Sequence, residues 1–364
     1  MKLLYVHNAD FLYYSANRIQ VLNMCKAFSK IVNITLMGFN CNKEVIKEKY
    51  GYDIDFEVVC LKPKGNYYLR SLQLFLNFLK IKDKFDYIFT RDLIFAFLVT
   101  KFLDKKVIYE LHDEPHGYPW YFLFRLVFKN LKCCIVVSEG LKQELINKGF
   151  NKEKIYTLYN GVNLNKFNIN ISKDRAREIL NLPKDKIIAS YVGSLYMWKQ
   201  YVKTFLDSFK YINNKNVLYL IVGGTEEQST KLRKIYSNYE NIKFIPYVSH
   251  SKVPLYLKAS DILVISYTSN NIKMRNYLAP LKLFEYMASK RPIVASDLPS
   301  IRKIVSEDDV LFFRPDDERD LAEKIDLLIE DKDLQIKLSN NAFKKVQNYT
   351  WENRAKKIVE IFRE

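Results

Sequence analysis

The chain has 364 residues, and its 58 lysines and arginines against 41 aspartates and glutamates give a net charge of +17. This length suits two domains better than one, and a hydrophobic content of 48% argues against a disordered chain. No stretch approaches the roughly 18 uninterrupted apolar residues of a membrane-spanning helix, and residues 1–6 are too short an apolar run for a secretory signal. We therefore expect a cytoplasmic protein whose basic charge attracts a phosphorylated ligand, an anionic lipid or nucleic acid.

In the first half of the chain, short apolar runs alternate with helix-length segments. The expected strands are Leu3–Val6, Asn33–Gly38, Phe56–Leu61, Tyr87–Thr90, Lys106–Glu110, Cys133–Val137 and Ile155–Leu158. Helices are expected between them at Ile19–Lys30, Tyr67–Lys80 and Leu141–Lys148. Strands that alternate with helices build right-handed βαβ units, so this half is predicted to form a parallel, doubly wound sheet.

A turn at Asn160–Asn163 and the polar stretch Asn165–Lys173 interrupt this pattern, and we place a domain boundary after residue 163. A second series of strands follows at Ile187–Gly193, Val217–Gly223, Ile242–Ile245, Ile262–Ser266, Ile293–Ser296 and Val310–Phe313. Its helices are expected at Val202–Tyr211, Ser229–Asn238, Lys252–Ala259, Pro280–Ser289 and Leu321–Glu330. The prediction is therefore an α/β protein of two Rossmann-like domains, residues 1–163 and 164–345. Residues 346–364 are expected to form a last helix that packs back across the junction. Ligands bind such sheets at the carboxyl ends of their strands, so a cleft between the domains is the expected site.

The most informative segment reads PLKLFEYMASKRPIVASD and begins at Pro280. Pro280 suits the first turn of a helix, whose free backbone N–H groups and positive dipole end form an anion site. Lys282 adds a formal charge in that turn. Glu285 lies five residues after Pro280, about 7 Å along the helix axis. At that distance a carboxylate can accept hydrogen bonds from the ribose next to a bound diphosphate. The pattern indicates a nucleotide site, with an ordinary amphipathic helix as the alternative.

This segment and its surroundings resemble glycosyltransferase family 4, the retaining enzymes of the GT-B fold, over nearly the whole chain. PLKLFEYMA is similar to a bacterial and archaeal polysaccharide-type branch of that family. Further segments match in order and spacing, namely LIVGG and FIPYV in the second half and the linker SEGLKQEL…YNGVNLNKF. The resemblance implies a GT-B fold and a retaining glycosyltransferase. Its partners would be a UDP- or GDP-linked sugar donor and a glycan or lipid-linked acceptor.

By this resemblance, Lys199 contacts the donor phosphates, and a lysine after a strand–glycine turn is a sensible stabiliser of a departing diphosphate. Glu285 binds the ribose, and the backbone N–H groups of Leu281 and Lys282 hold the diphosphate. The nucleobase lies against the loop at residues 246–248. The donor-binding set is thus Ser194, Lys199, Pro246, Tyr247, Val248, Asn276, Pro280, Leu281, Lys282 and Glu285.

Three positions depart from the family pattern. Ser194 stands where many members carry arginine, and Gln200 replaces a glycine after the phosphate lysine. Tyr277 occupies the place of a glutamate, eight positions before Glu285, that contacts the donor sugar. We expect backbone groups or Asn276 to replace that contact, and a catalytically silent glycosyltransferase-like scaffold is the alternative.

His112 directly follows the fifth expected strand, at the edge where α/β ligand sites collect. Family 4 has a functional histidine at the matching point, so the resemblance implies a catalytic role for His112. His116 is the competing candidate, and Glu110 or Asp113 could orient either ring.

The segment Ser15, Ala16, Asn17 and Arg18 precedes the first expected helix. Many family members have a Gly-Gly loop here that closes on the diphosphate. The small Ser15–Ala16 pair still allows close backbone approach, and Asn17 and Arg18 could donate to phosphate or acceptor. Ordinary helix capping by Ser15 and Asn17 is the alternative.

The retaining reaction implied by the resemblance needs no protein nucleophile, because the acceptor hydroxyl attacks on the face that the diphosphate leaves. We accordingly expect neither a cofactor nor a metal. Asp53 and Asp55 resemble the D-x-D metal motif of the other glycosyltransferase fold but lie far from the donor helix in sequence, so we interpret them as loop residues.

Basic and aromatic residues are interleaved in the first half, as in the segment Tyr118–Lys132. This composition suits a bilayer interface, so we expect membrane contact through the first domain, on the inner face of the cell membrane, and a role in cell-surface polysaccharide or glycoconjugate synthesis. A buried core helix at Tyr118–Lys132 is the alternative. A nucleic-acid-binding protein is the rival class, but the sequence has neither a compact basic stripe nor a known binding module, so no nucleic-acid partner is expected.

Overall fold

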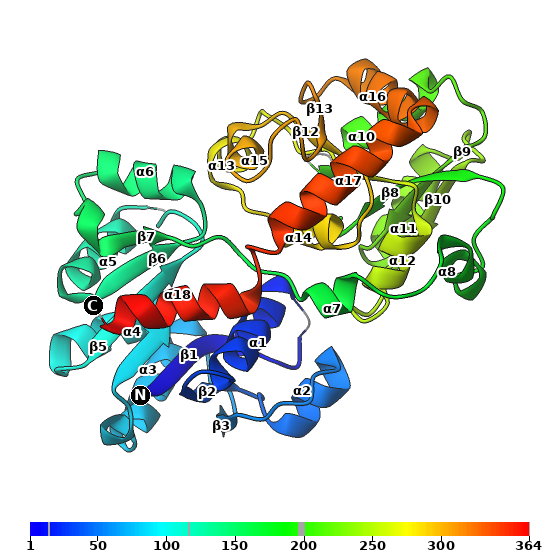
Figure 1. Ribbon diagram of the computed structural model, residues 1–364. Helices are drawn as coiled ribbons and strands as arrows, with labels where there is room; N and C mark the ends of the chain where they lie inside the picture. Colours follow the sequence, from blue (N-terminus) through cyan, green and yellow to red (C-terminus); the bar gives the residue numbers. More distant parts are fainter. Residues whose placement is uncertain (14, 116, 196–200, 364) are drawn as a thin grey trace. The chain divides into compact units, whose positions relative to one another are not determined.

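The computed structural model describes residues 1–13, 15–115, 117–195 and 201–363. The chain divides into two compact units (Figure 1), of which unit 1 comprises Met1–Asn160 with Trp351–Glu364 and unit 2 comprises Gly161–Thr350. The division falls three residues before the predicted boundary, and the last helix belongs to unit 1.

Unit 1 contains a parallel seven-stranded sheet with the strand order β3-β2-β1-β4-β5-β6-β7. Its central strands are buried on both faces and are therefore almost continuously apolar, as is usual where helices cover a parallel sheet. The strands are β1 Lys2–Asp10, β2 Asn33–Phe39, β3 Glu57–Leu61, β4 Tyr87–Thr90, β5 Lys106–Leu111, β6 Cys133–Val136 and β7 Ile155–Thr157.

The helices of unit 1 are mostly capped by polar side chains that precede them. Asn66 and Asp92, for example, accept hydrogen bonds from backbone N–H groups of the first turns of α3 and α4. The helices are α1 Ala16–Ser29, α2 Lys43–Tyr50, α3 Tyr67–Leu79, α4 Leu93–Phe102, α5 Tyr118–Asn130, α6 Glu139–Asn147 and α18 Trp351–Arg363, with 3₁₀ turns at η1 Lys82–Lys84 and η2 Lys152–Lys154.

The last helix, α18, packs along α1 (Figure 1). The Tyr87 hydroxyl donates to the Phe362 carbonyl at 2.8 Å, and the two rings stack with centroids 5.0 Å apart. The end of the chain therefore completes the core of the first half rather than that of the second.

Unit 2 contains a parallel six-stranded sheet in the order β10-β9-β8-β11-β12-β13. Its strands are β8 Ile187–Val192, β9 Val217–Val222, β10 Ile242–Ile245, β11 Ile262–Ile265, β12 Ile293–Ser296 and β13 Leu311–Phe313. Its helices are α7 Leu164–Phe167, α8 Lys173–Ile179, α10 Lys203–Ser208, α11 Glu226–Ile235, α12 Val253–Ala259, α13 Ile272–Tyr277, α14 Leu281–Ala288, α15 Pro299–Arg302, α16 Glu318–Glu330 and α17 Lys332–Val346, with a 3₁₀ turn η3 at Phe209–Tyr211. The predicted pair of doubly wound parallel sheets is confirmed.

Several helices begin earlier than predicted because polar residues start them. α11 begins at Glu226, after a capping box in which the side chains of Thr225 and Gln228 each accept from the other's backbone N–H. α16 begins at Glu318 because the carboxylate of Asp317 accepts from two N–H groups of its first turn. Apolar periodicity alone does not detect these polar first turns.

In each sheet the strand order reverses direction at one point, between β1 and β4 in unit 1 and between β8 and β11 in unit 2. Loops on the two sides of such a switch point turn away from each other and leave room for a ligand at the carboxyl ends of the strands. Functional residues are therefore expected directly after these strands.

Candidate functional site

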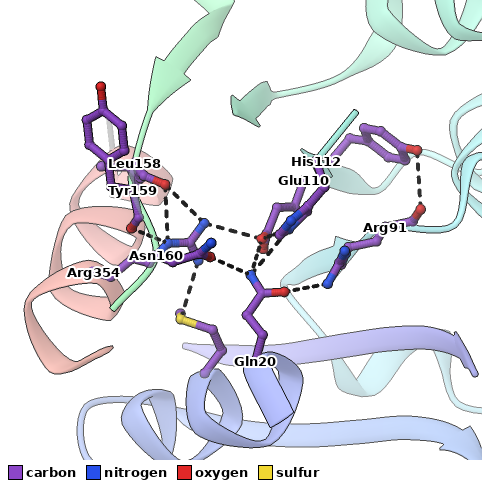
Figure 2. A network of polar contacts seen from close by, with 10 residues as sticks. Gln20, Arg91, Glu110, His112, Leu158, Tyr159, Asn160 and Arg354 are labelled. Atoms are coloured by element: carbon purple, nitrogen blue, oxygen red, sulfur yellow. Dashed lines mark hydrogen bonds and ion pairs between the residues drawn. The ribbon is translucent and has the colours of Figure 1, made fainter. Parts of the chain in front are cut away.

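In unit 1 a buried carboxylate, Glu110 of β5, lies at the centre of a polar network (Figure 2). Its Oε1 accepts from the Gln20 amide at 2.5 Å and forms an ion pair with Arg354 of α18 at 3.3 Å. The same oxygen contacts Nε2 of His112, two residues further along the chain. Of the two carboxylates expected to orient a histidine, Glu110 therefore contacts His112.

The charges of this network set the protonation of His112. Burial alone would raise the pKa of Glu110, but Arg354 and His112 lower it, and the net direction is down. Burial, together with Arg91, lowers the pKa of His112 to about 4 although Glu110 opposes the shift. Near neutral pH the pair is thus a carboxylate and a neutral imidazole. Because a carboxylate only accepts, Nε2–H donates to Glu110 and Nδ1 is left as the acceptor of the ring.

Gln20 and Arg354 connect this pair to the residue after β4 and to the segment after β7 (Figure 2). The Gln20 oxygen accepts from Arg91, which follows β4. Arg354 donates to the Tyr159 carbonyl at 3.0 Å, so α18 is joined to the segment after β7. The site residues predicted from the sequence did not include Gln20, Arg91 or Arg354. A signal was available, since Gln20 and Arg354 are polar residues among the mainly apolar buried positions of their helices.

The segment Ser15–Arg18 lies at the start of α1, which begins at Ala16 rather than at Ile19. Ser15 occupies the N-cap position, but within the described residues its side chain makes no capping hydrogen bond to the backbone. Its hydroxyl instead contacts the side chains of Asn17 and Arg18. Side-chain capping by Ser15, the alternative interpretation, is therefore wrong, and Asn17 lies inside the first turn.

Two arginines and a histidine gather near the switch point of unit 1. Arg18 Nε donates to the Asp10 carbonyl at 2.8 Å, and in the described part of the chain neither Arg18 nor Arg91 forms an ion pair with a carboxylate. His7 of β1 is buried, and burial followed by Arg91 and Arg18 lowers its pKa well below the usual value. This corner of unit 1 therefore carries cationic charge that is suited to an anion.

In unit 2 the corresponding position is occupied by the start of α14. Pro280 has extended dihedral angles and is the N-cap of α14, so the helix begins at Leu281, one residue later than predicted. The helix is tied to the end of β8, since the Tyr286 hydroxyl contacts the backbone N–H and C=O of Val192 at 2.7 and 3.0 Å. Leu281 and Lys282 thus form the first turn of a helix that points at the switch point.

The side chain of Lys282 turns toward the glycine loop after β8. Its Nζ donates to the Tyr191 hydroxyl at 2.6 Å, and that hydroxyl donates to the Ser194 carbonyl at 2.8 Å. A Cβ atom on Gly193 would lie 2.6 Å from this Nζ, so the ammonium fits because residue 193 is a glycine. Burial lowers the pKa of Lys282 to about 7.

A second glycine brings the loops after β8 and β9 together. Gly223 has a φ of 131°, and a Cβ atom there would lie 2.0 Å from the Gly193 carbonyl oxygen. No side chain fits that space. The two loops therefore meet backbone to backbone next to the first turn of α14.

Glu285, on the next turn of α14, accepts from a histidine that the sequence analysis left without a role. His250 Nε2 lies 2.8 Å from Glu285 Oε1, and its Nδ1 lies 2.8 Å from Lys166 Nζ. The imidazole also packs edge-on against Phe167, with centroids 5.6 Å apart. Nothing local in the sequence predicts this contact, because the residues that make it are 35 and 84 positions apart.

The remaining predicted donor residues are distributed over unit 2. Pro246, Tyr247 and Val248 follow β10, and the Tyr247 backbone N–H donates to the Gly224 carbonyl at 2.7 Å. Asn276 lies in α13, together with Tyr277. Lys199, Gln200 and His116 lie outside the described residues.

Asp53 and Asp55 lie in the exposed loop between α2 and β3, so their interpretation as loop residues is confirmed. Asp53 pairs with Lys47 at 2.9 Å, and Asp55 accepts from Ser29 at 3.0 Å. Over the described ranges no group of three or more histidines, cysteines, aspartates or glutamates is placed to hold a metal ion. No helix in those ranges is long and apolar enough to cross a membrane.

Comparison with known proteins agrees with this two-unit architecture. Residues 19–166 match the family model described as Glycosyltransferase Family 4, and residues 172–345 match the model described as Glycosyl transferases group 1. HepE of Anabaena, solved in complex with UDP and glucose, superposes with a TM-score of 0.81 at 17% identity over 100% of both chains. Sucrose-phosphate synthase of Thermosynechococcus elongatus superposes with a TM-score of 0.77 at 17% identity, over 100% of this chain and 98% of the other. The fold is therefore GT-B.

Two curated relatives are glycosyltransferases by name. An uncharacterized glycosyltransferase of Methanocaldococcus jannaschii is 26% identical over 335 residues, covering 84% of this chain and 82% of the relative. The N,N'-diacetylbacillosaminyl-diphospho-undecaprenol alpha-1,3-N-acetylgalactosaminyltransferase of Campylobacter jejuni is 27% identical over 233 residues, covering 62% of this chain and 59% of that enzyme. With both halves matched by glycosyltransferase families, the chain is a glycosyltransferase of the GT-B fold.

Proposed function

We propose that this glycosyltransferase moves a sugar from a UDP- or GDP-linked donor to a glycan or lipid-linked acceptor, with retention of configuration and without a metal. One observation carries the proposal. The start of α14 combines a helix N-terminus, the Lys282 ammonium and the Glu285 carboxylate beside two glycine loops at the switch point of unit 2. These are the groups that a diphosphate and its ribose require.

In this proposal, unit 2 binds the nucleotide. The N–H groups of Leu281 and Lys282 hold the diphosphate, with Ser194 beside them and Lys199 as a second cation. Glu285 accepts from the ribose hydroxyls. The base lies against Pro246, Tyr247 and Val248. Tyr277 has no carboxylate to contact the donor sugar, and Asn276 is the candidate that replaces this contact.

In the proposed reaction His112 of unit 1 is the catalytic histidine, and its neutral imidazole offers Nδ1 as an acceptor for a sugar hydroxyl. Unit 1 also has the groups proposed to bind phosphate or the acceptor, namely Arg18 and Arg91 with Ser15, Ala16 and Asn17 at the start of α1. The bond from the anomeric carbon to the phosphate oxygen breaks as the bond to the acceptor oxygen forms on the same face. The acceptor's proton passes to the departing diphosphate oxygen. No protein nucleophile takes part.

The proposed acceptor brings the protein to the inner face of the cell membrane, in the synthesis of cell-surface glycans. A surface of exposed apolar side chains on α3 and α5, here called the α3–α5 face, supports this part; it comprises Tyr68, Leu69, Leu72, Leu76, Tyr118 and Phe122. Tyr68 of α3 stacks on Trp120 of α5, so the helices share this face. One side of α5 is part of the core, since Phe124, Val127 and Phe128 are buried, whereas Tyr118 on the other side is 81% exposed and supports the proposed bilayer contact.

Thermal unfolding with a panel of nucleotides tests the proposal. We expect UDP or GDP to stabilise the protein, and we expect Glu285→Ala to lose most of that shift. Glu323→Ala is a matched control, because Glu323 is an exposed carboxylate on α16 of the same unit. If no nucleoside diphosphate raises the melting temperature, the proposed donor is wrong. If nucleotide binds and no sugar nucleotide is hydrolysed or transferred, the chain is the silent scaffold instead.

A further inference from the structure

The contact between His250 and Glu285 has no part in the mechanism proposed above. His250 lies between β10 and α12, and its side chain is only 12% exposed, against 17% for Glu285. It bridges two charged groups, since Nε2 is 2.8 Å from Glu285 Oε1 and Nδ1 is 2.8 Å from Lys166 Nζ. Because the imidazole of His250 contacts a charged group with each ring nitrogen, these contacts determine which of the two nitrogens carries the proton.

The direction of this chain of hydrogen bonds follows from its ends. A lysine ammonium can only donate, so Nδ1 of His250 accepts from Lys166. An ionised carboxylate can only accept, so Nε2 carries the proton and donates to Glu285. Both ring nitrogens are thereby assigned, and one oxygen of Glu285 is held in place from the side of His250.

The elements around this contact hold it in position. Lys166 lies on the short helix α7, whose N-cap Asn163 accepts from the Lys166 backbone N–H at 3.1 Å, and α7 packs against α14. Phe167, the next residue of α7, packs against the imidazole ring. The arrangement resembles the outer hydrogen bonds that orient metal ligands, in which a buried partner fixes the group that meets the ligand.

We propose that His250 and Lys166 are positioning residues for Glu285. They hold one carboxylate oxygen so that the other accepts from the hydroxyls of the donor's ribose. This inference rests on the proposed ribose contact of Glu285 and deepens it. The preference of this enzyme for ribonucleotides over deoxyribonucleotides then depends on His250 and Lys166, although neither touches the nucleotide.

A matched pair of substitutions separates positioning from packing. The amide nitrogen of glutamine reaches about as far as Nε2 of histidine, whereas that of asparagine reaches only to the Nδ1 position. His250→Gln therefore keeps a donor toward Glu285, and His250→Asn removes it. Lys166→Met removes the donor to Nδ1 and frees the ring to change tautomer.

The readout is the ratio of dissociation constants for 2′-deoxy-UDP and UDP, repeated with 2′-deoxy-GDP and GDP. A hydrogen bond to a charged group corresponds to a ratio of about 10 or more in the parent protein. We expect Glu285→Ala and His250→Asn to bring the ratio close to one, Lys166→Met to lower it, and His250→Gln to retain most of it. A purely structural role predicts lower melting temperatures with an unchanged ratio.

The outcomes distinguish the two levels of the proposal. If the parent protein binds no nucleoside diphosphate, or if Glu285→Ala keeps the full ratio, the proposed ribose contact fails. If Glu285→Ala loses the ratio while folded His250→Asn and Lys166→Met both keep it, the positioning inference alone is overturned. If His250→Asn does not fold, the ratio of dissociation constants measured for Lys166→Met decides the positioning inference. Lys166 is only partly buried on α7, so its replacement is expected to disturb folding less.

Discussion

Among the described residues, a histidine–carboxylate pair lies at the candidate site of each unit, and the two pairs are used in opposite senses. In unit 1 the side chain of Glu110 is fully buried and that of His112 is 24% exposed, so the carboxylate supports the imidazole. In unit 2 the two side chains are enclosed to a similar degree, and the imidazole, which Lys166 contacts on its other side, donates to the carboxylate and so supports it. The comparison teaches that the further partners of such a pair, Arg354 on Glu110 and Lys166 on His250, show which member the protein holds in place.

The largest expected difference between the pairs is in stability. Glu110→Ala removes the only ion-pair partner that Arg354 has among the described residues and leaves a buried guanidinium uncompensated. We expect this change to lower the free energy of unfolding by about 3–5 kcal/mol. Glu285→Ala leaves only the half-buried His250 without its acceptor, and about 1 kcal/mol is expected. Urea unfolding of the two variants checks this. Similar losses for both would contradict the proposed difference in roles.

The next effect is on catalysis by the imidazole of unit 1. We expect His112→Ala to lower kcat by about 100-fold, the usual cost of one hydrogen bond made in the transition state, with little change in the dissociation constant of the nucleoside diphosphate. Glu285→Ala should instead weaken nucleotide binding. Steady-state kinetics and calorimetry distinguish the two patterns. Weaker nucleotide binding in His112→Ala would contradict the proposed role, because His112 is proposed to contact a sugar hydroxyl and not the nucleotide.

We expect Lys282 to make nucleotide binding depend on pH. Its pKa is lowered to about 7 by burial, so above pH 7 the free protein must take up a proton before the ammonium can meet a diphosphate. Affinity for UDP or GDP should fall by up to about 10-fold between pH 7 and 8.5. Stability should change in the opposite sense, because from about pH 7 to 10.5 the unfolded chain binds more protons at this group and stability rises with pH. Lys282→Met should flatten both dependences, and calorimetry over this range provides the check.

His112 gives unit 1 its own pH dependence. Its pKa falls from 6.5 unfolded to about 4 folded, so between these values the unfolded state binds more protons and stability falls as pH falls. His112→Asn should lose less stability than the parent protein between pH 6.5 and 4. His7, whose pKa is also lowered by burial, contributes in the same direction and serves as a comparison through His7→Asn. Thermal unfolding at each pH measures the effect.

The smallest expected effect concerns the α3–α5 face. Replacing both Tyr118 and Phe122 by serine should weaken binding to vesicles containing phosphatidylglycerol several-fold, since each ring loses apolar area that the interface would bury. Ile235→Ser is the matched control, because Ile235 is a 50% exposed apolar residue in unit 2. If all variants sediment equally with the vesicles, the α3–α5 face does not contribute to membrane binding.

Much of the fold follows from local pattern. Apolar runs such as Ile262–Ile265 predict strands because parallel strands covered on both faces must be apolar throughout. Helix starts were predicted less well, since Ala16 and Glu226 begin helices within polar segments. Of the candidate site, the sequence predicted α14 with Lys282 and Glu285, and His112 beside Glu110, because these residues are close in the chain.

By itself, the sequence determined the two parallel-sheet halves and the position of helix α14, because apolar periodicity and a proline-led helix start are encoded within a few residues. Only the tertiary structure decided which groups support the functional ones. Arg354 reaches Glu110 from the other end of the chain, and His250 reaches Glu285 from 35 positions away. Such contacts depend on how sheets and helices stack, and the resulting burial sets which carboxylate is enclosed and which imidazole stays neutral.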